Sequence, residues 1–215
     1  MLRTITAQEI AQMEDFFRRT FVNSLTGFKS VCLVGTQDKE GKTNLAIFSQ
    51  IIHIGANPPL IGILVRPEKS PRHTLSNIEA TRCFTLNHIR EEFYQQAHQT
   101  SARYPKEISE FDACGFTPVY SSLLPHAPYV QESNIRIGLE FAERINIQLN
   151  DTILIIGKII EVIFPKECLW HDGYLDIEQA GTITSSALDS YHTTKRLARL
   201  QYAKPNLPVR ELNRL

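Results

Sequence analysis

Residues 43 to 74 bring amide, hydroxyl and guanidinium groups into one short part of the chain. An expected strand from Thr43 to Ser49 carries an amide and hydroxyls, Arg66 follows, and Ser70-Pro71-Arg72-His73-Thr74 comes next. Serine followed by proline is typical of a helix start, where free N–H groups and a partial positive charge attract anions. Arginine can bind phosphate through two parallel hydrogen bonds. The combination predicts a pocket for a planar ligand that carries a phosphate.

Each of these features also has a purely structural explanation. A Ser-Pro pair usually does no more than cap a helix, and arginines such as Arg66 and Arg72 are more often solvated than bound to a ligand. Asn44 could simply belong to the turn before it, which contains Gly41. The prediction of a ligand site therefore depends on the combination.

The surrounding pattern predicts a mainly β protein with flanking helices. Thr6 and Glu9 have the spacing of a capping box, and apolar residues then recur at helical spacing, so one helix is expected over 6–25. A second helix is expected from Ser70-Pro71 to about residue 81, and a third over 91–104. Strands are expected over 30–37, 45–54, 60–66, 83–89, 135–149 and 153–164.

The connections between these strands favour an antiparallel barrel. Asp38–Gly41 and Asn150–Asp151 are typical turn sequences, and Pro58–Pro59 cannot lie in a central strand because proline has no N–H to donate. Six or seven strands linked mostly by hairpins predict an antiparallel β-barrel. Residues 105–131 contain four prolines and are expected to meander over the surface. We predict one domain over 1–215, with the barrel at about 28–165 and a C-terminal tail over 166–215.

Length and charge limit the classes of protein that fit this chain. Its 215 residues include 23 basic and 23 acidic side chains, so charge gives no reason to expect binding to nucleic acid or an anionic membrane. The N-terminal sequence lacks the apolar region of a signal peptide, and apolar runs such as Ile153 to Ile156 are far shorter than the roughly 20 residues that span a membrane. We expect a cytoplasmic protein that binds neither nucleic acid nor membrane.

The cysteines and histidines form no recognisable metal or catalytic motif. None of the four cysteines belongs to a C-x-x-C pair, and buried apolar roles are expected for them. No metal site is predicted, and no catalytic acid or base is assigned. Three histidines are expected in surface or loop positions: His126, His171 and His192.

The order of motifs resembles a known family. N-x-A-x-x-S at residue 44, N-P-P-L at 57, R-P-x-x-S-x-R-H-T-L-x-N-I at 66 and C-F-T-L-N at 83 are similar to the flavin reductase-like, FMN-binding split-barrel proteins. The resemblance covers residues 28 to about 165. It implies an antiparallel split β-barrel that binds FMN, and a homodimer with FMN between the barrel and the partner subunit. It also implies electron transfer from NAD(P)H through FMN to a second acceptor, such as a small molecule or another flavin.

The resemblance further implies which residues bind the cofactor. Ser70, Arg72 and Thr74 match the phosphate-binding segment, with Arg66 in support. The other matches surround the flavin ring and the ribityl chain, where small Ala46 allows close approach and backbone groups of residues 48–50 meet the polar edge of the ring: Asn44, Ala46, Phe48, Ser49, Gln50 and Asn87.

Two regions leave the function open. Many NAD(P)H-dependent members carry Gly-Asp-His where this chain has Asn150-Asp151-Thr152, so an FMN-binding electron carrier without a nicotinamide site is an alternative. A split barrel that binds another ligand, such as haem or a pyridine cofactor, is a further one. The tail from Ser190 to Leu200 resembles tails that approach the flavin, with Tyr191 able to stack on it, but it could equally be the solvated face of a basic helix.

Overall fold

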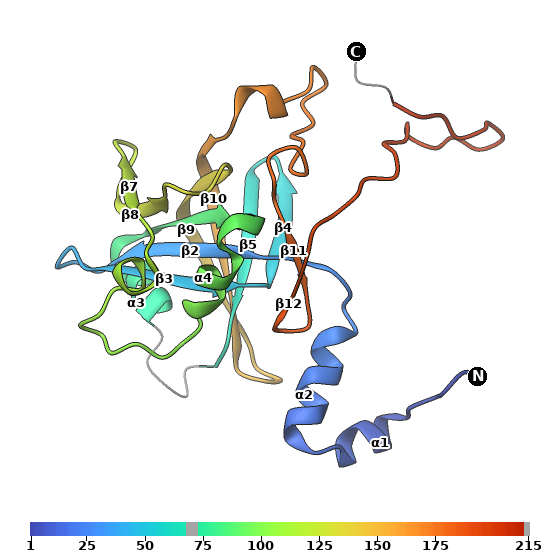
Figure 1. The fold of residues 1–215 in the computed structure, drawn as a ribbon, viewed down its shortest axis with the longest axis horizontal. Coiled ribbons are helices and arrows are strands. Elements are labelled where there is room, and N and C mark those ends of the chain that lie inside the picture. Colours follow the sequence, from blue (N-terminus) through green and yellow to red (C-terminus); the bar gives the residue numbers. More distant parts are fainter. Residues whose placement is uncertain (68–72, 213–215) are drawn as a thin grey trace.

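The computed structural model describes residues 1–67 and 73–212. Its centre is a curled antiparallel sheet (Figure 1). Its strands are β2 (Cys32–Gln37), β3 (Thr43–Phe48), β4 (Ile51–Ala56), β5 (Pro59–Val65), β6 (Cys83–His88), β9 (Arg136–Ile147) and β10 (Thr152–Ile163). They are ordered β3-β2-β6-β9-β10-β5-β4, and every pair of neighbours is antiparallel. The predicted mainly β architecture is confirmed.

Apolar side chains from the central strands fill the inside of the curled sheet. Phe84 of β6 is fully buried, and its ring occupies the space where Gly157 of β10 has no side chain. Helix α3 (His73–Thr81) adds Leu75 and Ile78 to the same core, as its spacing predicts. The start that was expected for this helix at Ser70-Pro71 lies outside the described residues.

The prediction of one long strand over 45–54 is wrong. The chain leaves β3 after Phe48 and re-enters the sheet as β4 at Ile51, so the two strands form opposite ends of the sheet order. The backbone N–H of Leu64 in β5 donates to the carbonyl of Gln50 (3.1 Å), which fixes this crossing point. The predicted turns at 38–41 and 150–151 are confirmed, and Asp151 has a positive φ of 59°.

Residues 105–131 contain more regular structure than expected. The sequence pattern did not predict three short elements in this stretch: α5 packs against β3, β8 against β2 and β6, and β7 pairs with β8. The helix expected over 91–104 is shorter. The elements here are η1 (Glu91–Phe93), α4 (Tyr94–Gln99), α5 (Glu110–Cys114), β7 (Pro118–Ser121) and β8 (Leu124–Val130).

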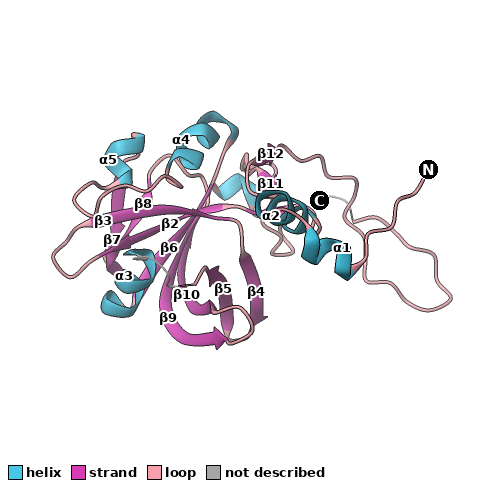
Figure 2. Ribbon diagram, turned by 90° about the horizontal axis from the view of Figure 1, so that it is seen from below, coloured by secondary structure: helices cyan, strands magenta, loops and turns pink. Residues whose placement is uncertain are grey.

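The single helix expected over 6–25 is two helices, α1 (Ala7–Gln12) and α2 (Asp15–Ser24). The capping box of Thr6 and Glu9 is present, but Met13 is extended, and the Glu14 carboxylate caps the second helix by accepting from the N–H of Phe17 (3.0 Å). Neither helix contains a buried residue. Figure 2 shows both helices to one side of the barrel, so their apolar residues do not join the core.

The C-terminal part returns to the barrel as a small sheet. Here β1 (Lys29–Ser30) pairs with β11 (Thr184–Ser186), which pairs with β12 (Ser190–His192). A 3₁₀ turn, η2 (Lys166–Cys168), lies before this sheet, and residues 193–199 are irregular. The basic residues after Tyr191 are thus not a helix.

The expected burial of the four cysteines is confirmed, and all four are free thiols. Burial raises the pKa of the Cys32 thiol to about 12. Within residues 1–67 and 73–212 there is no cluster of three or more His, Cys, Asp or Glu side chains that could hold a metal ion. Over the same residues, no helix combines the length and the apolar character needed to span a membrane.

Candidate functional site

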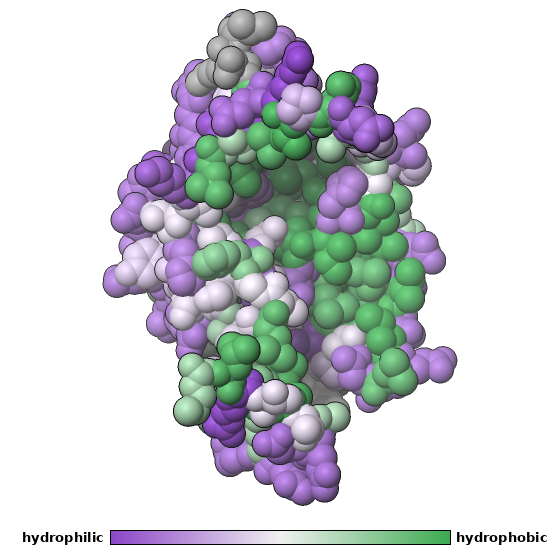
Figure 3. Space-filling model, turned by 90° about the vertical axis from the view of Figure 1, so that its right-hand side faces the viewer, coloured by the Kyte–Doolittle hydropathy of each residue, from purple (hydrophilic) through white to green (hydrophobic). Residues whose placement is uncertain are grey.

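A cleft of about 1120 Å³ runs beside strand β3. Its walls come from β3, the end of β5, the start of α3, the segment 98–106, the turn at 150–152 and the β11–β12 hairpin. Segments far apart in the sequence therefore meet at one concave surface. Apolar side chains also gather around a hollow on the side of the molecule that lies on the right in Figure 1 (Figure 3). A cleft of this size is large enough for a ligand such as a nucleotide cofactor, since small-molecule pockets measure roughly 300–1,000 Å³.

Most of the residues that the sequence predicted to bind the cofactor line the cleft. Ser70 and Arg72 lie outside the described residues. Eight of the other nine candidates line the cleft: Asn44, Ala46, Phe48, Ser49, Gln50, Arg66, Thr74 and Tyr191.

Asn87 is not among the residues that line the cleft. It is fully buried, its Nδ2 donates to the carbonyl of Leu33 (3.1 Å) and to Thr85 Oγ1 (2.9 Å), and its Oδ1 accepts from the N–H of Val130 (2.9 Å). These bonds join β6 to β2 of the same sheet and to β8, which belongs to the two-stranded sheet β7–β8. The side chain has a structural role here, and we do not include it in the candidate site.

A buried polar network supports the floor of the cleft. Asn44 Nδ2 donates to Thr74 Oγ1 (3.1 Å) and to Thr36 Oγ1 (3.3 Å), and Asn77 Nδ2 donates to the same Thr36 oxygen (3.2 Å). All four side chains are buried. The network ties β3 to the start of α3, which fixes the two elements that the sequence motif joins.

Helix α5, which the sequence pattern did not predict, holds β3 from the other side. The buried Glu110 carboxylate accepts from the backbone N–H of Leu45 (3.0 Å), and the Ser109 and Thr43 hydroxyls lie 2.6 Å apart. As β3 is an edge strand, this carboxylate occupies an N–H that the sheet leaves without a strand partner. The position of β3 at the cleft is thereby set on both sides.

The electrostatic character of the lining suits an anionic ligand. Arg66, Arg103 and Lys106 contribute positive charge, while Glu110 is the one acidic side chain among the described lining residues. Since that carboxylate already binds a backbone N–H, little negative charge faces the cleft. Arg103 and Lys106 belong to a segment whose part in the site was not predicted.

Tyr191 meets a histidine that the sequence analysis did not identify. The Tyr191 hydroxyl lies 2.7 Å from His98 Nδ1, the two rings pack edge to face, and both residues line the cleft. Burial, with a smaller effect of the Asp189 carboxylate, raises the pKa of the Tyr191 phenol to about 12. The phenol therefore keeps its proton at neutral pH and can donate it to the imidazole. Nothing in the sequence links the two residues, which are 93 positions apart.

The arrangement of these elements agrees with solved structures. A protein of Shewanella frigidimarina NCIMB 400, described as a flavin reductase with a split barrel domain, is 44% identical, with a TM-score of 0.90 over 94% of this chain and 100% of that one. Nitrilotriacetate monooxygenase component B from Bacillus cereus is 22% identical, with a TM-score of 0.79 over 95% and 99% of the two chains. Flavoredoxin of Desulfovibrio vulgaris (Miyazaki F) is 22% identical, with a TM-score of 0.69 over 84% and 92%.

Fold and cleft together define a split-barrel protein of the flavin-related oxidoreductase class. The family model for the flavin reductase like domain matches residues 28–177, and the chain belongs to this family. The resemblance noted from the sequence motifs, and the split-barrel fold that it implies, are therefore confirmed.

Proposed function

We propose that the cleft binds FMN and that the protein passes electrons from NAD(P)H through FMN to a second acceptor, such as another flavin. The observation that carries this proposal is the convergence of eight of the residues predicted from the sequence on one cleft whose charge is mainly positive. Thr74 at the start of α3, together with Arg66, would hold the phosphate, and Ser70 and Arg72 belong to the same motif. Ala46 leaves room for the ring beside β3.

The residues present fit such a cofactor. The lining offers hydroxyls and cations near α3 and smaller or apolar side chains along β3, which is the division that a phosphate and a flat ring require. Bound flavin supplies the redox chemistry, and the protein supplies position and electrostatics. The buried network of Asn44, Thr36 and Asn77 fixes the Thr74 hydroxyl before a ligand arrives, which lowers the entropic cost of binding.

The same site could serve an electron carrier without a nicotinamide site. Thr152 lines the cleft where many family members have a histidine, and its hydroxyl lies 2.7 Å from Asn150 Oδ1. That hydroxyl is therefore already engaged within its own turn. This contact is the observation that favours the second candidate.

Steady-state assays separate the two candidates. We expect the purified protein to oxidise NADH or NADPH when FMN and an artificial electron acceptor are present, and to show saturation with the nicotinamide. The control reaction omits the protein. If the protein binds FMN, is reversibly reduced by dithionite and yet gives no NAD(P)H turnover, the carrier replaces the reductase as the proposed function.

A homodimer, which the resemblance implies, is the second part of the proposal. Ile54 of β4 and Leu154 of β10 both approach Gly62 of β5, and Ile145 of β9 lies directly opposite Leu154, so they form one apolar face. Ile54 and Ile145 are exposed, and so are Phe16, Phe17 and Val22 of α2. Exposed apolar surface that continues over several elements is typical of an interaction site. We propose that a second copy of this chain covers it.

Sedimentation tests the dimer directly. The wild-type protein is expected to sediment as a dimer at micromolar concentration, and Ile54→Glu is expected to shift it to monomer because a charge would be buried in the interface. Leu123→Glu is the matched control, since Leu123 is exposed on the β7–β8 hairpin. A wild-type monomer, or equal behaviour of the two variants, would refute this interface.

A further inference from the structure

The irregular segment after β12 returns to the loop that follows η2 and is held there by two arginines. Trp170 and Tyr174 pack edge to face, with ring centroids 5.4 Å apart. The Arg199 guanidinium carbon lies 4.7 Å from the Trp170 centroid and 4.0 Å from that of Tyr174, and Arg196 lies 5.2 and 5.8 Å from the same rings. Two cations thus cover one aromatic pair, an arrangement that is attractive because of the ring quadrupoles.

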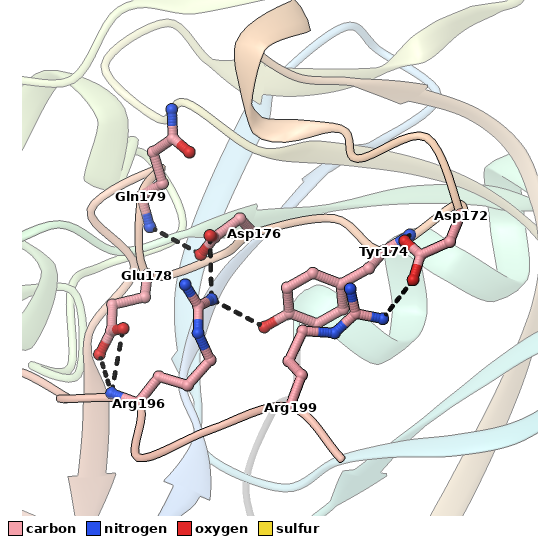
Figure 4. Close-up of polar contacts among 7 residues, drawn as sticks. All are labelled: Asp172, Tyr174, Asp176, Glu178, Gln179, Arg196 and Arg199. Atoms are coloured by element: carbon pink, nitrogen blue, oxygen red, sulfur yellow. Dashed lines mark hydrogen bonds and ion pairs between the residues drawn. The ribbon is translucent and has the colours of Figure 1, made fainter. Parts of the chain in front are cut away.

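Acidic groups complete this contact, as Figure 4 shows. Arg196 Nη1 lies 2.9 Å from Asp176 Oδ2, whose side chain is only 3% exposed, and Arg199 Nη2 lies 2.7 Å from Asp172 Oδ2. The backbone N–H of Arg196 donates to both carboxylate oxygens of Glu178 (2.9 and 3.1 Å). We call this set the arginine clasp: Trp170, Asp172, Tyr174, Asp176, Glu178, Arg196 and Arg199.

The clasp closes the base of the β11–β12 hairpin. The chain leaves the clasp after Glu178, forms β11 and β12, and re-enters it at Arg196. Near its tip the hairpin is also held, because Lys29 Nζ donates to the carbonyl of Ala187 (2.5 Å). Within the hairpin, Tyr191 lies directly opposite Ser185. The hairpin is therefore fixed at both ends.

No clasp residue is among the described residues that line the cleft, whereas Tyr191 in the hairpin does line it and contacts His98. We infer that Arg196 and Arg199 are positioning residues for the cleft, because they hold the hairpin so that the Tyr191 hydroxyl stays on His98 Nδ1. This inference rests on the proposed function, since it treats the cleft as the flavin site. The tail is then part of the site's wall although its arginines never touch the ligand.

The test uses Arg196→Gln, Arg199→Gln and the double variant, with Arg210→Gln as matched control. Arg210 lies in the same tail and is exposed. Two readouts need no flavin. Fluorescence of Trp170, which is the chain's single tryptophan, reports clasp opening, and the ¹⁵N signals of the His98 ring report the bond to Tyr191, with Tyr191→Phe as the reference for its loss.

Three results are expected together. Clasp variants shift the His98 signals toward those of Tyr191→Phe, and Arg210→Gln does not. They raise the FMN dissociation constant by about 10-fold, as Tyr191→Phe does, which corresponds to about 1.4 kcal/mol. Combining Arg199→Gln with Tyr191→Phe adds little further loss, because residues that act through one contact are not additive.

Two results would overturn the inference. One is a clasp variant with altered Trp170 fluorescence and unchanged His98 signals. The other is an additive loss of FMN affinity in the combined variant, which would mean that the clasp acts independently of Tyr191. If the wild-type protein does not bind FMN at all, the proposed function fails, while the His98 signals still decide whether the clasp positions Tyr191.

Discussion

Replacing Ala46 with tryptophan is expected to weaken FMN binding by about 100-fold or more. Ala46 lines the cleft from β3, and β3 cannot move away because the Asn44 network and the Glu110 carboxylate hold it on both sides. A large ring placed where the flavin ring is proposed to lie must therefore compete with the ligand, and overpacking of a fixed site costs about 1–3 kcal/mol or more.

Fluorescence titration with FMN measures this effect. Ala46→Gly is the control, because it removes bulk and keeps the space open, and its affinity is expected to stay within a few fold of the wild type. Far-ultraviolet circular dichroism checks that the tryptophan variant is folded. A folded Ala46→Trp protein with wild-type FMN affinity would place the ring elsewhere.

Replacing Phe84 with alanine is expected to lower the free energy of unfolding by about 3–5 kcal/mol. The Phe84 side chain is fully buried, and Gly157 opposite it has no side chain that could fill the resulting cavity. Leucine and isoleucine neighbours such as Leu139 are held in paired strands, so the cavity cannot collapse easily. A loss of this size is a large fraction of the stability of an ordinary domain.

Urea denaturation followed by circular dichroism gives this free energy. Leu123→Ala serves as the control, since Leu123 is 61% exposed and truncation of an exposed side chain usually changes stability by less than about 0.5 kcal/mol. A loss below about 1 kcal/mol for Phe84→Ala would show that the core rearranges around β6 and β10 far more readily than their packing indicates.

Much of the site was predictable because its signals are local. Asn44 to Thr74 is a short stretch in which the role of each hydroxyl, amide or cation can be inferred from its near neighbours. The structure places seven of the predicted residues of this stretch, together with the distant Tyr191, in the lining of the cleft. The turns at 38–41 and 150–151 were predictable for the same reason, since their residue types determine the backbone path.

What could not be predicted depends on long-range contacts. Helix α5 has five residues, and its Glu110 matters because it reaches Leu45, which is 65 positions away. The role of His98 in the site depends on its contact with Tyr191, which is 93 positions away in the sequence. Asn87 differs from the other predicted residues, since its motif suggested a cofactor contact, while the structure places its side chain in the interior and outside the lining of the cleft.

The break between α1 and α2 illustrates how local chemistry can override periodicity. The apolar spacing continues through Met13, but Glu14 caps a new helix, and the two helices face away from this chain's core. The regular apolar pattern therefore predicted helical structure and missed the break at Met13. In the proposed homodimer, the second subunit would cover the exposed apolar side chains of these helices.

Titration of the purified wild-type protein with FMN tests the central claim most directly. We predict saturable binding of one FMN per chain, with a dissociation constant of about 1 μM or lower and a change in the flavin absorption spectrum on transfer from water to the cleft. A folded protein that leaves the FMN spectrum and fluorescence unchanged at concentrations far above this value would contradict the account.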